Sequence, residues 1–210
     1  LLAAAGMGVA ALVTLLNEHI VTYEVIIAGV VVGGLIGAIM AKKVQMTSMP
    51  QMIALLNGFG GGASFAVASA EFFRGSANDT VSIIATGAAV LIGAVTLTGS
   101  LVAFAKLQEL IDGKPMGFPG MKLVNAILFI GSLVGIGYLV VNPGNEMVFW
   151  SLVAAAMVLG LFLVLPIGGA DMPVVIALLN SYSGVAASAA GFVMGNSALI
   201  ITGSLVGASG

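Results

Sequence analysis

Long runs of apolar residues, separated by short polar connections, dominate the pattern along the chain. Most runs approach the ~20 residues that a helix needs to cross the apolar layer of a bilayer. Backbone polar groups find no water in lipid, so each run is predicted to be a helix. The pattern predicts eight spans, at 1–16, 24–41, 49–70, 81–106, 122–141, 147–165, 172–194 and 197–210.

One apolar segment occurs twice. Met49–Asn57 reads MPQMIALLN, and Met172–Asn180 reads MPVVIALLN, 123 residues later. The proline suits the first turn of a helix, where its missing N–H has no partner to lose. Thr98–Val102 and Thr202–Val206 both read TGSLV. The same order in both halves predicts an internal repeat. We therefore expect a first transmembrane repeat over 1–106, a cytoplasmic connection over 107–121 and a second transmembrane repeat over 122–210.

Composition places the chain in a membrane. Charged residues make up 7% and hydrophobic residues 60%, and the mean hydropathy is +1.21. Soluble domains carry about 25% charged residues. The sequence has no basic patch for nucleic acid, and without cysteine it has neither a disulfide framework nor a thiolate metal site. We expect an all-α integral membrane protein that binds neither metal nor nucleic acid.

Lysines gather on one side of the predicted spans. They are Lys42 and Lys43 at the end of the span 24–41, and Lys106, Lys114 and Lys122 on the connection between the spans 81–106 and 122–141, while Arg74 falls on the other side. The positive-inside rule places these lysines, and both ends of the chain, in the cytoplasm. The two spans that carry the repeated segment then cross in the same direction. The halves are therefore predicted to be parallel repeats about an axis along the membrane normal.

Each repeated segment ends in an asparagine, Asn57 or Asn180. At 1.5 Å per residue, the amide lies ~10 Å into its helix, within the apolar layer. An amide can hydrogen-bond water through its donor and its acceptor, and so support a proton path. It can equally join neighbouring helices, for about 1 kcal/mol. Both interpretations stay open.

Four serines extend this candidate path. Ser181 and Ser183 follow Asn180, and Ser100 and Ser204 hold the same place in the two TGSLV segments. Most hydroxyls in membrane helices bond to their own backbone. A pair at matching positions of a repeat is nevertheless a candidate for lining a pore.

Asp171 is the acid at the cytoplasmic end of the span 172–194. It directly precedes Met172, so its carboxylate can cap the helix through the free N–H groups. Ser48 holds that place in the first copy, which makes the charge specific to the second and favours a gate or docking point. Capping and gating both stay open.

These motifs together resemble one family, the membrane domain of the β subunit of the proton-translocating NAD(P) transhydrogenase. The residues that carry the resemblance are Ala41–Val44 with Met49 and Pro50, Gly93–Thr96 through Ser100, and Ile167–Val175 continuing through Asn180–Gly184. The similarity extends over essentially the whole chain.

The resemblance implies an enzyme complex that couples proton passage across the membrane to hydride transfer between NADH and NADP+ on cytoplasmic domains. NADP(H) would bind a later domain of the same chain, and one more helix would precede residue 1. NAD(H) would bind a partner α subunit, which brings membrane helices of its own. Residues 1–210 would then hold no catalytic or cofactor-binding residue. The resemblance also implies the bacterial cytoplasmic (inner) membrane and a dimer of the whole complex.

The family's proton path implies roles for Asn180, Ser100 and Asp171, which match its polar members. Some relatives carry a histidine where this chain has Asn57, so the titrating group is expected on the partner's helices, with water held by Asn57 and Asn180 as the alternative. A secondary transporter for a small solute, bound between the repeats by the same two amides, is a competing hypothesis. A purely structural scaffold is a third.

Overall fold

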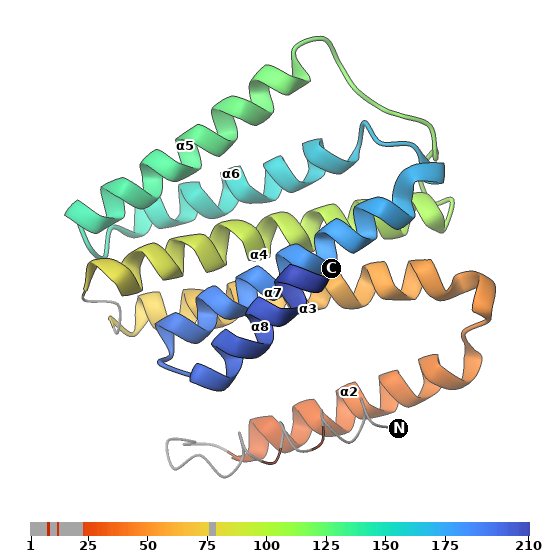
Figure 1. Cartoon of the computed structure of the whole chain (residues 1–210), viewed down its shortest axis with the longest axis horizontal. Helices are drawn as coiled ribbons and strands as arrows, with labels where there is room; N and C mark the ends of the chain where they lie inside the picture. Colours follow the sequence, from red (N-terminus) through yellow and green to blue (C-terminus); the bar gives the residue numbers. More distant parts are fainter. Residues whose placement is uncertain (1–7, 9–11, 13–22, 76–78) are drawn as a thin grey trace. The chain divides into compact units, whose positions relative to one another are not determined.

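The computed structural model describes residues 8, 12, 23–75 and 79–210, and over these residues its regular structure is entirely helical. The helices are α2 (Tyr23–Lys43), α3 (Met49–Phe73), α4 (Thr80–Leu107), α5 (Met121–Val141), α6 (Glu146–Val164), α7 (Met172–Val193) and α8 (Ser197–Ser209), shown in Figure 1. Short 3-10 turns, η1 (Met46–Ser48) and η2 (Gly169–Asp171), precede α3 and α7.

The all-helical membrane prediction is confirmed for the described residues. Among them, six helices, α2 to α7, are long and apolar enough to cross a membrane, while α8 has 13 residues and is shorter. The predicted span 1–16 lies outside the described residues apart from Gly8 and Leu12. The total of about eight spans therefore stays a prediction.

The chain divides into two units, Leu1–Gln45 and Met46–Gly210. The helix described in the first unit is α2, which ends with Lys42 and Lys43 in its last turn. Cations are favoured there by the helix dipole. The second unit contains every candidate residue of the predicted site.

α4 is the central helix of the second unit. It contacts α3, α5, α6 and α7. One cluster of buried apolar side chains joins it to α5 and α6 around Leu139 and Phe149, and a second joins it to α7 around Met172 and Leu179. A helix enclosed by protein on most sides has no polar face to present, which explains why its sequence is apolar all round.

Three helices of the second unit begin at a side-chain cap. Asp79 Oδ2 accepts from the amides of Val81 at 3.1 Å and Ser82 at 3.2 Å, at the start of α4. Asn145 caps α6 and Asn196 caps α8, each accepting one backbone N–H at 3.1 Å. These bonds satisfy N–H groups that have no intrahelical partner. The helices α3 and α7 instead have a proline in their first turn and lack a side-chain cap.

Asp79 makes the start of α4 sensitive to pH. Hydrogen bonds from Ser82 hold the pKa of the Asp79 carboxyl below its usual value. A lowered folded-state pKa means that the cap stabilises the helix above the unfolded-state pKa, and that this is lost as the pH falls through the folded-state pKa. We expect the hydrogen-exchange protection factors of Val81 and Ser82 to fall below about pH 4. Asp79→Asn keeps the cap and should abolish that dependence, and an unchanged pH profile in this variant would contradict the assignment.

Close glycine crossings join the helices into two hairpins. In the α3–α4 hairpin, a Cβ atom on Gly93 would lie 2.7 Å from the carbonyl oxygen of Gly61. In the α7–α8 hairpin, a Cβ atom on Gly203 would lie 2.7 Å from the carbonyl oxygen of Gly184. Small residues let membrane helices approach this closely. Gly61 and Gly184 are separated by the same 123 residues as the repeated segments, so the crossings correspond.

α3 and α7 lie side by side and run in the same direction (Figure 1). The side-chain nitrogen of Asn57 donates to the carbonyl oxygen of Ile176 at 3.1 Å, and further along both helices Gly60 faces the hydroxyl of Ser183. Later residues of α3 contact later residues of α7, so these two helices run parallel, while the arrangement of the halves as parallel repeats stays a prediction. A repeat of four helices in each half stays a prediction.

The two TGSLV segments do not occupy matching positions, which corrects one expectation from the sequence. Gly93, and not Gly99, makes the contact that corresponds to that of Gly203. A Cβ atom on Gly99 would meet Val164 of α6 at 3.1 Å and Leu179 of α7 at 3.3 Å. The identical letters are therefore offset along the two hairpins, and Ser100 and Ser204 are not structural equivalents.

Candidate functional site

Three of the predicted residues lie where α3 packs against α4 and α7. Asn57 and Ser100 are buried, with 8% and 0% of their surface exposed. A Cβ atom added to Gly58 of α3 would lie 3.1 Å from the Cβ atom of Ser100. The hydroxyl of Ser183 faces Gly60 of the same helix. Asn57, Ser100 and Ser183 thus lie along the surfaces where α3 packs against α4 and α7, and we call these three residues the three-helix cluster.

The amide of Asn57 is engaged with the neighbouring helix. Its nitrogen donates to the backbone of α7 at Ile176. This contact is the helix-joining role that the sequence left open, and it uses only the donor side of the amide. The amide oxygen retains acceptor capacity, so the bond is compatible with a second role.

The hydroxyl of Ser100 is buried, and it has no hydrogen-bond partner within the described part of the chain. The hydroxyl of Thr96, one turn earlier, bonds to Ile92 at 2.7 Å, and that of Thr98 bonds to Met157 at 2.9 Å. Ser100 thus differs from the hydroxyls beside it, which bond to backbone carbonyls. Leaving a buried hydroxyl unpaired costs about 1–3 kcal/mol, which favours a function that uses it.

The other candidates lie on α7 and α8. The hydroxyl of Ser181 donates to the carbonyl oxygen of Gly207, which ties α7 to α8. Ser204 is exposed, and its hydroxyl lies 3.0 Å from that of Ser188 beside a cavity of about 440 Å³. Asn180 is half-buried. Ser181 and Ser204 therefore bond within the α7–α8 pair, apart from the bonds of the three-helix cluster.

Asp171 ends the 3-10 turn η2 and is exposed. It is the N-cap residue of α7 by position, but its side chain makes no capping hydrogen bond. One of the two predicted roles, capping, is therefore not observed. The carboxylate faces outward at the start of α7, which leaves it accessible to another molecule.

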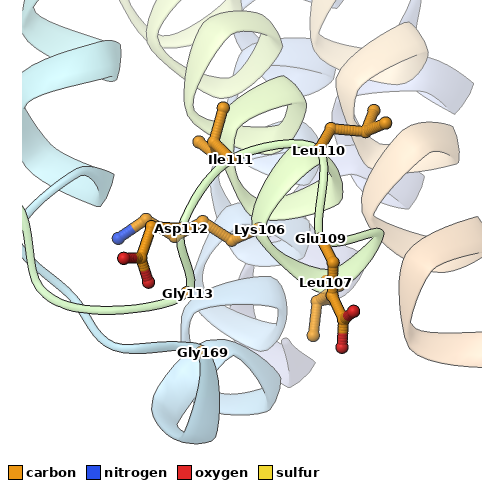
Figure 2. Close-up of a pocket in the computed structure, with 8 residues that line it drawn as sticks. All are labelled: Lys106, Leu107, Glu109, Leu110, Ile111, Asp112, Gly113 and Gly169. Carbon is orange, nitrogen blue, oxygen red and sulfur yellow. The ribbon is translucent and has the colours of Figure 1, made fainter.

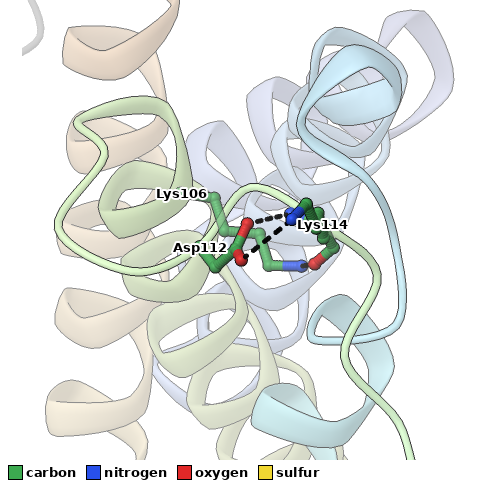
Figure 3. A network of polar contacts seen from close by, with 3 residues as sticks. All are labelled: Lys106, Asp112 and Lys114. Carbon is green, nitrogen blue, oxygen red and sulfur yellow. Dashed lines mark hydrogen bonds and ion pairs between the residues drawn. The ribbon is translucent and has the colours of Figure 1, made fainter.

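Lys106 is a candidate that the sequence pattern missed. The sequence predicts a cation on the connection between two spans, but Lys106 lies in the last turn of α4 with 3% of its surface exposed. Its Nζ donates to the carbonyl oxygens of Leu165 at 2.6 Å, Ile167 at 2.7 Å and Lys114 at 3.1 Å. Three acceptors match the three donors of an ammonium group. Figure 3 shows the ammonium beside Lys114 and Asp112. We call this arrangement the Lys106 clamp.

The Lys106 clamp joins the two connections at this end of the unit, because Lys114 belongs to the α4–α5 connection and Ile167 to the α6–α7 connection. Two backbone bonds reinforce it, from the amide of Gly169 to Gly113 at 2.8 Å and from the amide of Met116 to Leu165 at 3.0 Å. A cavity of about 540 Å³ opens beside them. Its lining residues, drawn in Figure 2, are Lys106, Leu107, Glu109, Leu110, Ile111, Asp112, Gly113 and Gly169.

The chain is similar to known proteins over its whole length. The family model for the NAD(P) transhydrogenase beta subunit matches residues 1–210. Two curated proteins from Rhodospirillum rubrum, both named NAD(P) transhydrogenase subunit beta, are 42% identical to this chain over 213 residues. The match covers 98% of this chain and 46% of each relative. The chain therefore spans about half the length of the curated relatives it matches.

Proposed function

Because the chain belongs to the NAD(P) transhydrogenase beta subunit family, we propose that its helices form the membrane domain that couples proton passage to hydride transfer between NADH and NADP+. The transfer itself would take place on cytoplasmic domains outside residues 1–210, an NADP(H) domain of the same chain and an NAD(H) domain of an α subunit. The setting would be the bacterial inner membrane, with both ends of residues 1–210 facing the cytoplasm and with the whole complex a dimer.

The observation that carries this proposal is the unpaired, fully buried hydroxyl of Ser100, which packs against Gly58, the residue after Asn57. A proton path through an apolar layer needs groups that both donate and accept hydrogen bonds, and hydroxyls and amides do both. Asn180, Ser181, Ser183 and Ser204 would extend the path along α7 and α8. Neither Asn57 nor a serine titrates near neutral pH, and proton relays normally include an ionisable group. We place that group on the membrane helices of the α subunit.

Asp171 would act as the gate at the cytoplasmic end of this path. Its exposed, uncapped carboxylate supports a contact with the NADP(H) domain. Coupling requires that domain to bind the two states of the gate with different affinities. The secondary-transporter hypothesis is less well supported, because the amide of Asn57 bonds to the backbone of α7 where that hypothesis needs it to face a solute.

Ser100→Ala tests the proposal, because its expected effect on the stability of the protein differs from its expected effect on proton uptake. Removing an unpaired buried hydroxyl should leave stability unchanged or raised. Removing a member of the proton path should lower proton uptake about tenfold, a change of ~1.4 kcal/mol in the barrier. The measurement is proton uptake driven by reverse transhydrogenation in vesicles that hold the full complex, with Asn180→Ala as a second variant.

The matched control is Ser132→Ala on α5. Ser132 is equally buried, but its hydroxyl bonds to the carbonyl oxygen of Leu128 at 2.7 Å. This variant should keep full coupling. If Ser100→Ala and Asn180→Ala also assembled and kept full proton uptake, these residues would only pack the helices, and the path would lie in the partner subunit.

A further inference from the structure

We propose that Lys106 is a positioning residue that holds the connection bearing Asp171 against α4, and so transmits movement between the three-helix cluster and the gate. The effect on coupling rests on the proposed function. The mechanical role of the Lys106 clamp does not, and it is tested separately.

The partners of Lys106 distinguish it from an ordinary lysine at a helix end. Such lysines extend toward water or interact with the last carbonyls of their own helix. Lys106 instead donates to Leu165 and Ile167, which follow directly after α6. The C-terminal end of a helix carries partial negative charge, so the cation is attracted to the end of a neighbouring helix. It joins α4 to a single segment whose two acceptors are 59 and 61 residues from it in sequence.

The three hydrogen bonds of the Lys106 clamp are expected to break together. A buried ammonium group is costly unless its donors are bonded, and each of the three donors has one carbonyl partner. A connection that moves away must either carry the lysine with it or break these bonds together. The arrangement therefore favours two discrete positions of the connection.

The lysine is also mechanically connected to the proposed proton path. Ser100 and Lys106 lie on the same helix, less than two turns apart, and Gly99 beside Ser100 packs against α6 and α7. A shift of α4 that follows a change around Ser100 would displace the cation and, through Ile167, the 3-10 turn that ends at Asp171. The path and the gate are thus joined by one rigid helix and one cation.

The first test measures whether Lys106 holds the connection. Residues 1–210 contain no cysteine, so Ile167→Cys introduces one reactive site among them, at a half-buried side chain packed against the second core cluster. In the full complex we expect maleimide labelling of Cys at this position, measured on this chain by mass spectrometry, to be about tenfold faster with Lys106→Gln than with the native lysine. Lys106→Met, which gives an unbranched side chain one atom shorter and without a donor, is the second variant.

The matched control is Lys114→Gln. The side chain of Lys114 is exposed and pairs with Asp112 at 3.9 Å, while only its backbone carbonyl belongs to the clamp. This change removes one positive charge at the same end without touching the clamp, and labelling should stay at the native rate. Unchanged labelling in both Lys106 variants would overturn the clamp.

The second test measures coupling in vesicles, as protons taken up per hydride transferred. We expect Lys106→Gln to lower this ratio about fivefold, and to lower it no further when Asp171→Asn is already present, because both act through the same connection. If the losses caused by Lys106→Gln and Asp171→Asn were additive, Lys106 would not transmit movement to the gate. The same would follow if labelling were faster while the ratio of protons to hydride stayed unchanged. Because labelling does not depend on proton movement, the clamp is supported by faster labelling even if Ser100→Ala and Asn180→Ala disprove the proposed path.

Discussion

Asp171→Asn is expected to lower proton-coupled turnover of the whole complex about tenfold. The substitution keeps the size of the side chain and removes only its charge. Because the carboxylate makes no capping hydrogen bond, the start of α7 should not weaken. Coupling free energies between two sites are typically 1–3 kcal/mol, or 5–150-fold, so the loss of one gate contact falls within that range. The measurement is turnover in vesicles under an imposed membrane potential, which supplies ~2.3 kcal/mol per charge at 100 mV.

Asp112→Asn is the control for this prediction. Asp112 is a second exposed acid at the same end, on the α4–α5 connection, where its oxygens bond to the amide of Lys114 at 2.9 Å and pair with the ammonium of Lys114 at 3.9 Å. It should affect turnover much less. Equal losses in the two variants would mean that general negative charge at this end matters, and the specific gate at Asp171 would be wrong.

Gly93→Val should destabilise the second unit by about 3 kcal/mol, at the upper end of the cost of overpacking. A Cβ atom at this position would lie 2.7 Å from the carbonyl oxygen of Gly61 and 3.0 Å from the amide nitrogen of Phe65. Both are backbone atoms of α3, so no side chain can rotate away to make room. The helices would have to separate, which would also open the three-helix cluster. Thermal unfolding of the purified complex measures the loss.

Gly131→Val on α5 controls for the effect of a valine in a membrane helix. A Cβ atom there would meet nothing within 4 Å, so stability should change by less than about 0.5 kcal/mol. If Gly93→Val unfolded at the native temperature, the close crossing of α3 and α4 would not be a determinant of stability.

The helices themselves were predictable from the sequence because the thickness of a bilayer sets their length. The predicted spans 122–141 and 172–194 differ from α5 and α7 by one residue at a single end, since apolar runs bounded by lysine, glycine or asparagine have few alternatives. The shared direction of α3 and α7 also followed from the positive-inside rule and the repeated segment. Both inferences use properties that are local in sequence.

The details of the site depend on contacts that local sequence does not determine. Five identical letters in the TGSLV segments gave no information on how far each lies along its hairpin, so the equivalence of Ser100 and Ser204 was wrong. The sequence predicts Lys106 as a loop cation, and it gives no sign of the three carbonyl partners because these are backbone atoms, which any sequence provides. One signal was available: the apolar run 81–106 includes this lysine instead of ending before it.

The bond between Asn57 and the backbone of Ile176 spans 119 residues of sequence, which has a consequence for how the protein is made. At a synthesis rate of about 5–20 residues per second, the α3–α4 hairpin enters the membrane roughly ten seconds before its partner helix emerges from the ribosome. During that interval the Asn57 amide faces lipid, water or the insertion machinery. An early hairpin with an unpaired polar group is a natural substrate for insertion factors that shield such groups, and its release should wait for the synthesis of α7.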